Sequence, residues 1–470
     1  MEHNKLETLT KKYEYVWDKI GENEVKEMMD FAEKYKDFMN KAKTEREATA
    51  EIVRMAKEKG FIDLNDAIAQ NKKLSAGDKV FAVNKEKAVA LFVIGATTME
   101  KGMNIVGSHI DSPRIDLKPN ALYEDEGFAL LETHYYGGIK KYQWVTIPLA
   151  LHGVVVKKGG EKVNIVIGED ENDPVLYITD LLIHLSADQM EKKLAKGIEG
   201  EDLNVLIGSR PIEDKEVKGR IKLNILRILN ERYGIDEEDF VTAEFEIVPA
   251  GRARDVGLDR SMVMAYGHDD RVCAYTSLEA ILEIEKPEKT CVALFVDKEE
   301  IGSNGATGMH SRFFENVVAE VMELMGEYSE LKLRRCLANS KMLSSDVTAA
   351  FDPIYPSVLE RKNTAYMGKG IVITKYTGSR GKYSCNDANA EFLGYLRDLF
   401  NKHNITWQTG ELGKVDQGGG GTIAYILAEY GMEVVDCGVA LLSMHAPWEI
   451  ASKADIYETY KAYKVFLQYA

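Results

Sequence analysis

The sequence predicts an α/β fold: a main domain with a mostly parallel sheet and helices on both faces, interrupted by a smaller β-rich domain. Three observations support this prediction. After Lys79, and again after Arg252, short apolar runs typical of buried strands alternate with stretches of helical periodicity. The block between these parts, residues 117–251, has patterns typical of antiparallel strands. Acidic and histidine side chains suited to a functional site occur before and after this block but hardly within it.

These patterns divide the 470 residues into a main domain in two parts, residues 1–116 and 252–470, and an inserted domain at residues 117–251. A chain of this length is sufficient for two or three domains. The hydrophobic content of 45% and the charged content of 29% are ordinary for a soluble globular protein.

The first part of the main domain begins with a helical segment. Between residues 5 and 60, apolar side chains such as Tyr13, Val16 and Ile20 recur three and four residues apart, and we expect this segment to dock on the main domain. The period then changes to that of strands. The predicted strands of this part are Lys79–Asn84, Ala88–Gly95 and Met103–Pro113.

The inserted block has elements of its own. Helical periodicity predicts helices at Ile178–Gly197 and Val217–Gly234. His184 lies in the first of these, next to Ile183, so the pattern alone indicates a core or surface histidine. The predicted strands of the block are residues 131–139, 143–158, 163–168, 204–210 and 241–251.

After Arg252 the alternation of strand and helix resumes. Gly418–Gly421 precede a helical stretch, but they lack the Gly-Lys-Ser/Thr ending of a phosphate loop, which argues against a nucleotide site. The predicted strands are residues 262–266, 290–296, 341–345, 370–374 and 433–442, and the predicted helices are residues 272–285, 310–325 and the C-terminal segment.

Six acidic or histidine residues fall at predicted strand ends or in the loops that follow them. In a parallel sheet the carboxyl ends of the strands share one edge, where binding sites form. Taken singly, each residue also fits a solvated strand end or a buried acid–histidine pair. Adjacent carboxylates at the end of a buried strand, however, must be paired, protonated or metal-bound. The six residues are His109, Asp269, Glu299, Glu300, Asp346 and His445.

Together these residues indicate a metal site. Two histidines with carboxylates and no cysteine suit zinc first, with cobalt or manganese as alternatives. Five ligands suffice for two divalent ions if Asp269 bridges them, which leaves Glu299 as the base for a metal-bound water. Asp111 follows His109 by two residues and lies on the same face of the strand, so it is placed to fix the tautomer of that histidine.

Composition excludes several other kinds of protein. The net charge of -16 argues against a nucleic-acid partner held by phosphate contacts. No apolar stretch approaches the roughly 18 residues that span a membrane, and the N-terminal residues lack the apolar core of a signal peptide. The five cysteines lie far apart without a CxxC pair, so we expect reduced cysteines and a cytoplasmic protein.

Five segments carry a resemblance to a known family. GSHIDSP, GHDDRVC, DKEEIGS, SSDVTAAFDP and SMHAPWE resemble, in order, the motifs of the aspartyl aminopeptidase family of dinuclear metallopeptidases. The resemblance spans almost the whole chain. It implies that His109 and Asp346 complete one metal site, that Glu300 and His445 complete the other, and that Asp269 bridges the two ions.

The same resemblance implies further roles. Glu299 matches the general base, and Asp111 matches the acid that orients His109. His184 resembles a histidine that family members project into the active site of a neighbouring subunit, which implies a catalytic role. The inserted domain would mediate dimerisation, and the family typically assembles as a tetrahedral dodecamer with its active sites facing an inner cavity.

The resemblance also implies a reaction: removal of the N-terminal residue from peptides, with a preference for acidic first residues. Because the chain is acidic, such a preference needs local positive charge. Lys375, Arg380 and Lys382 supply it, on a loop that follows a strand expected to end near the metals and that differs from the loop of better-known members. The alternatives are an aminopeptidase of broad, neutral specificity, a carboxypeptidase or deacylase, and a non-catalytic scaffold.

Overall fold

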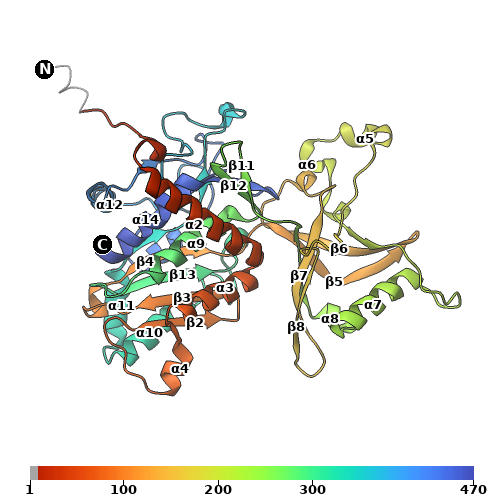
Figure 1. Cartoon of the computed structure of the whole chain (residues 1–470), viewed down its shortest axis with the longest axis horizontal. Coiled ribbons are helices and arrows are strands. Elements are labelled where there is room, and N and C mark those ends of the chain that lie inside the picture. Colours follow the sequence, from red (N-terminus) through yellow and green to blue (C-terminus); the bar gives the residue numbers. More distant parts are fainter. Residues whose placement is uncertain (1–8) are drawn as a thin grey trace. The chain divides into compact units, whose positions relative to one another are not determined.

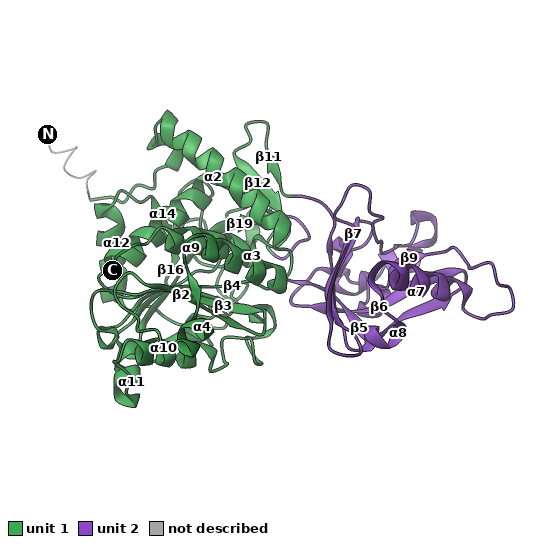
Figure 2. Ribbon diagram, turned by 60° about the horizontal axis from the view of Figure 1, so that its bottom comes forward, with its two compact units in different colours: residues 1–111, 253–444, 449–470 green, residues 112–252, 445–448 purple. Residues whose placement is uncertain are grey.

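The chain leaves its first unit after Asp111 and returns to it at Ala253. Figure 1 shows the helices and strands along the chain, and Figure 2 shows the two units in different colours. The computed structural model describes residues 9–470, so residues 5–8 of the expected helical segment lie outside it. Unit 1 consists of residues 1–111, 253–444 and 449–470, and unit 2 of residues 112–252 and 445–448. The expected inserted domain, residues 117–251, falls within unit 2.

The largest sheet of unit 1 has nine strands. In spatial order they are β1 (Ile62–Asp63), β2 (Lys79–Asn84), β3 (Ala88–Val93), β13 (Cys291–Val296), β4 (Asn104–His109), β14 (Lys341–Ser344), β18 (Glu433–Gly438), β16 (Ile371–Thr374) and β17 (Trp407–Thr409). The central strands β13, β4, β14 and β18 are parallel, whereas β3 and β16 each pair antiparallel with their neighbours β13 and β18. The predicted fold class, a mostly parallel sheet, is confirmed, and the carboxyl ends of β13, β4 and β14 meet at one edge.

A second sheet of unit 1 has five short strands. In spatial order they are β11 (Arg254–Val256), β12 (Met262–Ala265), β20 (Glu449–Ser452), β19 (Ala440–Leu442) and β15 (Thr348–Ala349). β12 leads into the next helix through Gly267, whose φ of 73° is adopted without steric cost by a residue that has no Cβ.

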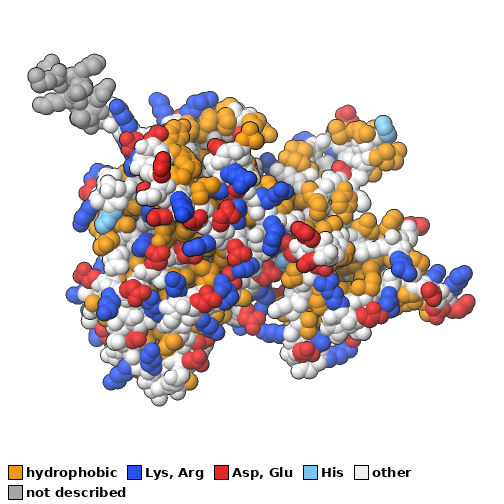
Figure 3. All heavy atoms as spheres, viewed as in Figure 1, with side chains coloured by type: hydrophobic (Ala, Val, Ile, Leu, Met, Phe, Trp, Pro, Cys, Tyr) orange, Lys and Arg blue, Asp and Glu red, His pale blue; other side chains and the backbone are white. Residues whose placement is uncertain are grey.

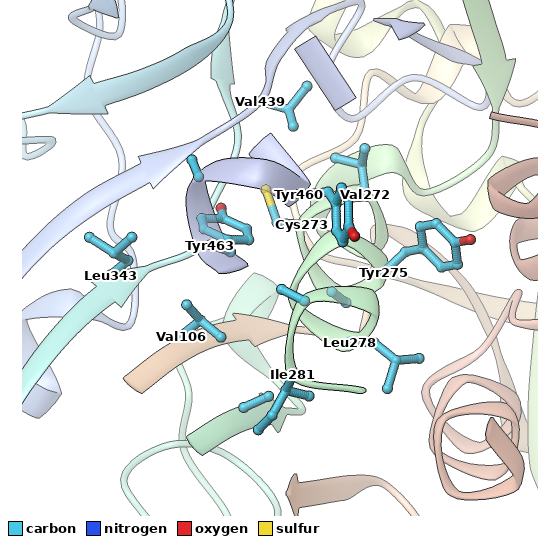
Figure 4. Packing of buried hydrophobic residues seen from close by; sticks show 14 of the residues in the cluster. Val106, Val272, Cys273, Tyr275, Leu278, Ile281, Leu343, Val439, Tyr460 and Tyr463 are labelled. Carbon is cyan, nitrogen blue, oxygen red and sulfur yellow. The ribbon is translucent and has the colours of Figure 1, made fainter. Parts of the chain in front are cut away.

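Helices cover both faces of the large sheet because its strands are apolar on both sides. On one face, Val106 and Leu343 pack with Tyr275 and Tyr463 in a core that Figure 4 shows from close by. On the other face, Ile105 and its neighbours form a separate core. The helices of the first core are α2 (Glu22–Lys41), α3 (Glu45–Glu58), α9 (His268–Leu282), α12 (Ala390–Lys402) and α14 (Lys453–Tyr469), and those of the second are α4 (Leu64–Ala69), α10 (Phe313–Leu324), α11 (Glu330–Ala338) and α13 (Ala424–Ala428).

The N-terminal segment is helical only in part. The expectation of a helix through Tyr13 and Ile20 is wrong, because regular helix begins at Glu22. Before it, the N–H of Val16 donates to the carbonyl oxygen of Gly368 at 2.8 Å, so a tertiary hydrogen bond replaces the helical one. Single 3-10 turns lie at Val16–Asp18, Met99–Lys101, Lys141–Gln143, Ile183–Leu185, Gly200–Asp202, Glu299–Ile301 and Pro356–Val358.

Unit 2 is built on a six-stranded antiparallel sheet. In spatial order its strands are β8 (Lys162–Ile167), β7 (Leu149–Val156), β10 (Glu244–Pro249), β5 (Arg114–Asp125), β6 (Phe128–Tyr136) and β9 (Val205–Gly208). Its helices are α5 (Ala187–Met190), α6 (Leu194–Gly197), α7 (Arg220–Tyr233) and α8 (Glu237–Val241). The predicted helix at Ile178–Gly197 is therefore wrong, since only the 3-10 turn Ile183–Leu185 and the single turns of α5 and α6 form there. Within residues 9–470, no helix is long and apolar enough to cross a membrane.

Candidate metal centre

Four of the predicted site residues come from the carboxyl ends of three neighbouring strands. β13, β4 and β14 are paired in parallel, and Val296 lies opposite His109 at the end of the ladder. His109 is the last residue of β4, while Glu299 and Glu300 follow the end of β13 and Asp346 follows the end of β14. Parallel pairing therefore brings residues that are far apart in the sequence to one edge of the sheet.

Asp269, in the first turn of α9, belongs to one of two groups of side chains that have His109 in common. The ligand atoms of His109, Asp269 and Asp346 lie within 4.8 Å of one another, and so do those of His109, Glu299 and Glu300. The Nε2 atom of His109 lies 3.2 Å from Oδ1 of Asp269 and 3.9 Å from Oε2 of Glu299. The two groups share His109, so they adjoin each other at this edge of the sheet.

The carboxylate of Asp111 accepts hydrogen bonds from the backbone N–H groups of Glu299 and Glu300. Its Oδ1 accepts the N–H of Glu299 at 3.1 Å, and its Oδ2 accepts the N–H of Glu300 at 3.2 Å. Both N–H groups reach one carboxylate because Lys298, just before them, takes a φ of 70° and turns the chain. The Nδ1 atom of His109 lies 3.1 Å from the carbonyl oxygen of Asp111 and 3.3 Å from its Oδ1. The predicted contact between Asp111 and His109 is thus present.

The electrostatics of this cluster favour a cation. Burial raises the pKa of Asp346 well above its usual value, and the charges of Glu299 and Asp269 add to the effect. Burial likewise raises the pKa of Asp270, beside Asp346. Burial alone would lower the pKa of His109, but hydrogen bonds to two aspartates raise it instead. Histidine nitrogen and carboxylate oxygens are the ligands that zinc takes, and a divalent ion would offset the crowded negative charge.

Two acids outside the predicted set also support the centre. Oδ2 of Asp270 accepts the N–H of His109 at 3.3 Å, and Oε2 of Glu449 accepts the N–H of Asp269 at 3.1 Å. Both side chains are buried. The sequence held a signal for each, since Asp270 is the second acid of the GHDDR segment and Glu449 is an acid within a strand pattern, where burial requires a partner.

Comparison with known proteins identifies the family. A family model described as Aminopeptidase I zinc metalloprotease (M18) matches residues 38–467. The chain belongs to the M18 family. A probable M18 family aminopeptidase 1 from Clostridium acetobutylicum is 61% identical over 459 residues, which are 98% of this chain and 99% of the relative. The crystal structure of an M18 aminopeptidase from Thermotoga maritima has a TM-score of 0.93 at 46% identity and covers 98% of this chain and 100% of that chain.

The predicted family and enzyme class are confirmed: the protein is an M18 metallo-aminopeptidase of the zinc type, a hydrolase. A more distant structure, the S. cerevisiae mApe1 dodecamer, has a TM-score of 0.76 at 20% identity and covers 94% of this chain and 97% of that chain. At that identity the likeness concerns the fold alone.

In this M18 chain, His445 lies in the segment 445–448, which belongs to unit 2. Its Nδ1 lies 2.8 Å from the carbonyl oxygen of Gly138. A carbonyl oxygen can only accept, so Nδ1 carries the proton and Nε2 keeps the lone pair that a metal ligand needs. The role of His445 as a ligand stays a prediction.

His184 is not on the helix face that the sequence suggested. It lies in the single 3-10 turn Ile183–Leu185, and its side chain is exposed. Its neighbours Ile183 and Leu185 are each 70% exposed. Nothing in unit 2 buries this histidine, so a core role is wrong and a surface position is correct.

The expected position of the basic loop is also wrong. β16 runs antiparallel to β18, so Lys375, directly after β16, leaves the sheet at the edge opposite to that of His109. The ammonium groups of Lys375 and Lys382 both contact the carboxylate of Asp387, the second at 2.9 Å. Arg380 is exposed on the same loop. Strand direction, which a single apolar run does not encode, is the reason for the error.

Proposed function

We propose that this M18 aminopeptidase is a dinuclear enzyme that removes the N-terminal residue of peptides. The observation that carries the proposal is the meeting of two three-residue groups at His109, on one edge of the sheet. His109 and Asp346 would hold one ion, Glu300 and His445 the other, and Asp269 would bridge them.

The metal, Glu299 and Asp111 have separate roles in the proposed reaction. Zinc, when bound, supplies a Lewis acid for the scissile carbonyl and lowers the pKa of the attacking water. Glu299 takes a proton from that water and later delivers it to the leaving amine. Its Oε2 lies 3.9 Å from Nε2 of His109, and its side chain is only 15% exposed, so it faces the cluster. Asp111 restrains Glu299 at the backbone.

The surplus of carboxylates around the centre also selects the substrate. A free N-terminal ammonium group is attracted to them, which places the first peptide bond at the ions. The test compares peptides that have a free N-terminus with their N-acetylated forms after zinc loading. We expect hydrolysis of the free peptides only. Cleavage of the acetylated forms, or release of C-terminal residues, would replace the proposal with the deacylase or carboxypeptidase alternative.

We further propose that unit 2 mediates self-association. Its segment 175–194 exposes a run of apolar side chains, and Figure 3 shows hydrophobic atoms gathered over the part that carries α5 and α6. Contiguous exposed apolar surface of this kind marks interaction sites. His184 lies within this run and would act in the active site of a second copy. The side chains are Val175, Leu181, Leu182, Ile183, Leu185, Met190 and Leu194, with exposed fractions between 51% and 70%.

Shared active sites can be tested by mixing two inactive variants. His184→Ala and Glu299→Gln subunits each lack one component of the site. If His184 acts on a neighbouring subunit, one arrangement in a mixed oligomer restores a complete site. We expect activity to return on co-assembly. Mixed oligomers that stay inactive would refute the shared site.

A preference for an acidic first residue is the finer part of the proposal. It is supported by the resemblance to the aspartyl aminopeptidase family rather than by the position of the basic loop. Broad specificity for neutral residues is the alternative. The ratio of kcat/KM for aspartyl and leucyl substrates distinguishes the two, and a ratio far below one would leave a broad aminopeptidase.

A further inference from the structure

Behind the metal centre, helix α2 contacts the start of α9 through one pair of buried side chains. The hydroxyl of Tyr35 lies 2.5 Å from Nδ1 of His268, and the two rings stack at 5.6 Å with an interplanar angle of 28°. The Nε2 atom of His268 lies 3.0 Å from the carbonyl oxygen of Val263. Tyr35 and His268 are each 0% exposed.

The contacts fix the direction of both hydrogen bonds. A carbonyl oxygen can only accept, so Nε2 of His268 donates to Val263. In the neutral ring Nδ1 is then the acceptor, and Tyr35 donates its hydroxyl proton to it. The ring of His268 is therefore held in one tautomer and one orientation, at the residue directly before Asp269.

Asp269 needs such support because its backbone is not helical. Its φ of -79° and ψ of 105° differ from those of the rest of α9, so helical hydrogen bonds do not set its direction. Each of three successive residues is anchored instead. Tyr35 holds the ring of His268, Glu449 accepts the N–H of Asp269 at 3.1 Å, and Asp270 accepts a backbone N–H at the end of β4 at 3.3 Å.

We propose that Tyr35 is a positioning residue of the metal centre: through His268 it fixes the main chain at Asp269 and so aims the carboxylate of Asp269. Groups that orient a ligand in this way contribute to metal affinity although they do not touch the ion. The inference rests on the proposed role of Asp269 as a metal ligand. It extends the functional site to α2, which supplies no ligand itself.

The test is Tyr35→Phe, which keeps the ring and removes the hydroxyl. Zinc affinity is measured on metal-free protein by competition with a chromophoric chelator, and we expect it to fall about 10–100-fold. Cobalt-loaded protein should show an altered visible absorption spectrum, because that spectrum reports the geometry of the ligands. Tyr275→Phe is the matched control. Its ring lies 5.3 Å from that of Tyr35, and its side chain is 1% exposed.

The outcomes separate positioning from packing. A loss of affinity and a changed spectrum in Tyr35→Phe, with both unchanged in Tyr275→Phe, would support the inference. If both variants melt at a lower temperature while affinity and spectrum stay as in the wild type, Tyr35 is structural only and the inference is wrong.

Three further variants complete the test. Asp269→Asn that retains wild-type affinity would refute the proposed function, whereas Asp269→Asn that loses metal beside an unaffected Tyr35→Phe would refute this inference alone. Should Tyr35→Phe fold poorly, His268→Asn offers an acceptor near the position of Nδ1 and should lose less affinity than His268→Ala. Equal affinities of these two variants would also refute the inference.

Discussion

The backbone N–H groups of Glu299 and Glu300 donate to the same carboxylate, that of Asp111, but we propose different roles for the two side chains. Because both N–H groups donate to Asp111, the two residues form a rigid pair whose side chains reach neighbouring positions of the cluster. Rigid placement lets one carboxylate hold an ion while the next exchanges a proton. The separation of tasks can be tested one carboxylate at a time.

Glu299→Gln should keep its metal and lose turnover. The amide can accept a hydrogen bond but cannot take a proton, so we expect kcat to fall by at least about 10²–10⁴-fold. Glu300→Gln should instead reduce metal content. Metal analysis of both purified variants, beside their kinetics, checks the assignment, and the opposite pattern would mean that the roles are exchanged.

The crowded carboxylates should make the metal-free protein less stable at higher pH. The pKa values of Asp346, Asp270 and His109 are raised by folding, so the folded state binds their protons more tightly. The contribution of such groups to the free energy of unfolding is complete below the pKa that they have in the unfolded chain. It is lost as the pH rises through the pKa that they have in the folded protein. The loss begins above the ordinary aspartate value of 3.8, and that from His109 begins above 6.5.

We therefore expect the Tm of chelator-treated protein to fall between about pH 5 and pH 8. Zinc should flatten this slope, because a bound ion replaces the protons as the compensating charge. Thermal melts with and without zinc across this pH range measure how Tm depends on pH. A metal-free Tm that rises with pH would contradict the electrostatic account.

At the scale of strands and helices, the sequence predicted the features that depend on the local pattern of apolar residues, such as the positions of the strands. β4, β13 and β14 are apolar runs followed by acids or ending in histidine, so the sequence predicts that the candidate ligands lie at one edge. β16 is an equally apolar run, but its direction is set by its partner β18. The segment 178–197 has helical periodicity, yet apart from Ile178 its apolar side chains are not buried in unit 2.

The same distinction explains the residues that were missed. Asp270, Glu449 and Tyr35 act on backbone groups or on a neighbouring ring, and their partners come close only in the folded chain. A metal ligand shows itself through residue type and its place at a strand end. Asp270 and Glu449 are acids whose place in the pattern signals burial, but the sequence does not show which backbone group each one contacts, and Tyr35 carries no such signal.

The reversed direction of β16 leads to a prediction about specificity. Since Lys375 leaves the far edge of the sheet and contacts Asp387, Lys375→Ala should change the ratio of kcat/KM for aspartyl and leucyl substrates by less than about twofold, because exposed ion pairs contribute little. Steady-state kinetics with both substrates checks this. A selective loss for the aspartyl substrate would return Lys375 to the substrate site.

At the scale of the whole molecule, the site brings together parts that the chain keeps far apart. Residues 109, 269, 299–300 and 346 all come from unit 1, and unit 2 is inserted between the first of them and the rest. Metal affinity therefore depends on the completed unit rather than on any single segment. Zinc content is accordingly a measure of correct folding of unit 1.

Removal of the metal ions should abolish hydrolysis, and adding metal back to the metal-free protein should restore it. Five candidate ligands exceed the four of one tetrahedral zinc, so we expect full activity to require two equivalents per chain. Titration of zinc, cobalt or manganese into chelator-treated enzyme gives the stoichiometry. Full activity at one equivalent, or without metal, would refute the dinuclear proposal.

The burial of α14 has a consequence for biosynthesis. This helix lies in the same core as α9, and near its end the carbonyl oxygen of Leu467 accepts a hydrogen bond from Asn104 of β4 at 3.1 Å. Lys453–Tyr469 leave the ribosome after every other described element. Unit 2, whose residues 112–252 are contiguous, can fold while translation continues, but unit 1 cannot close its core until this helix has emerged. A stalled or truncated chain would thus expose the apolar faces of α9 and β4 to chaperones and proteases.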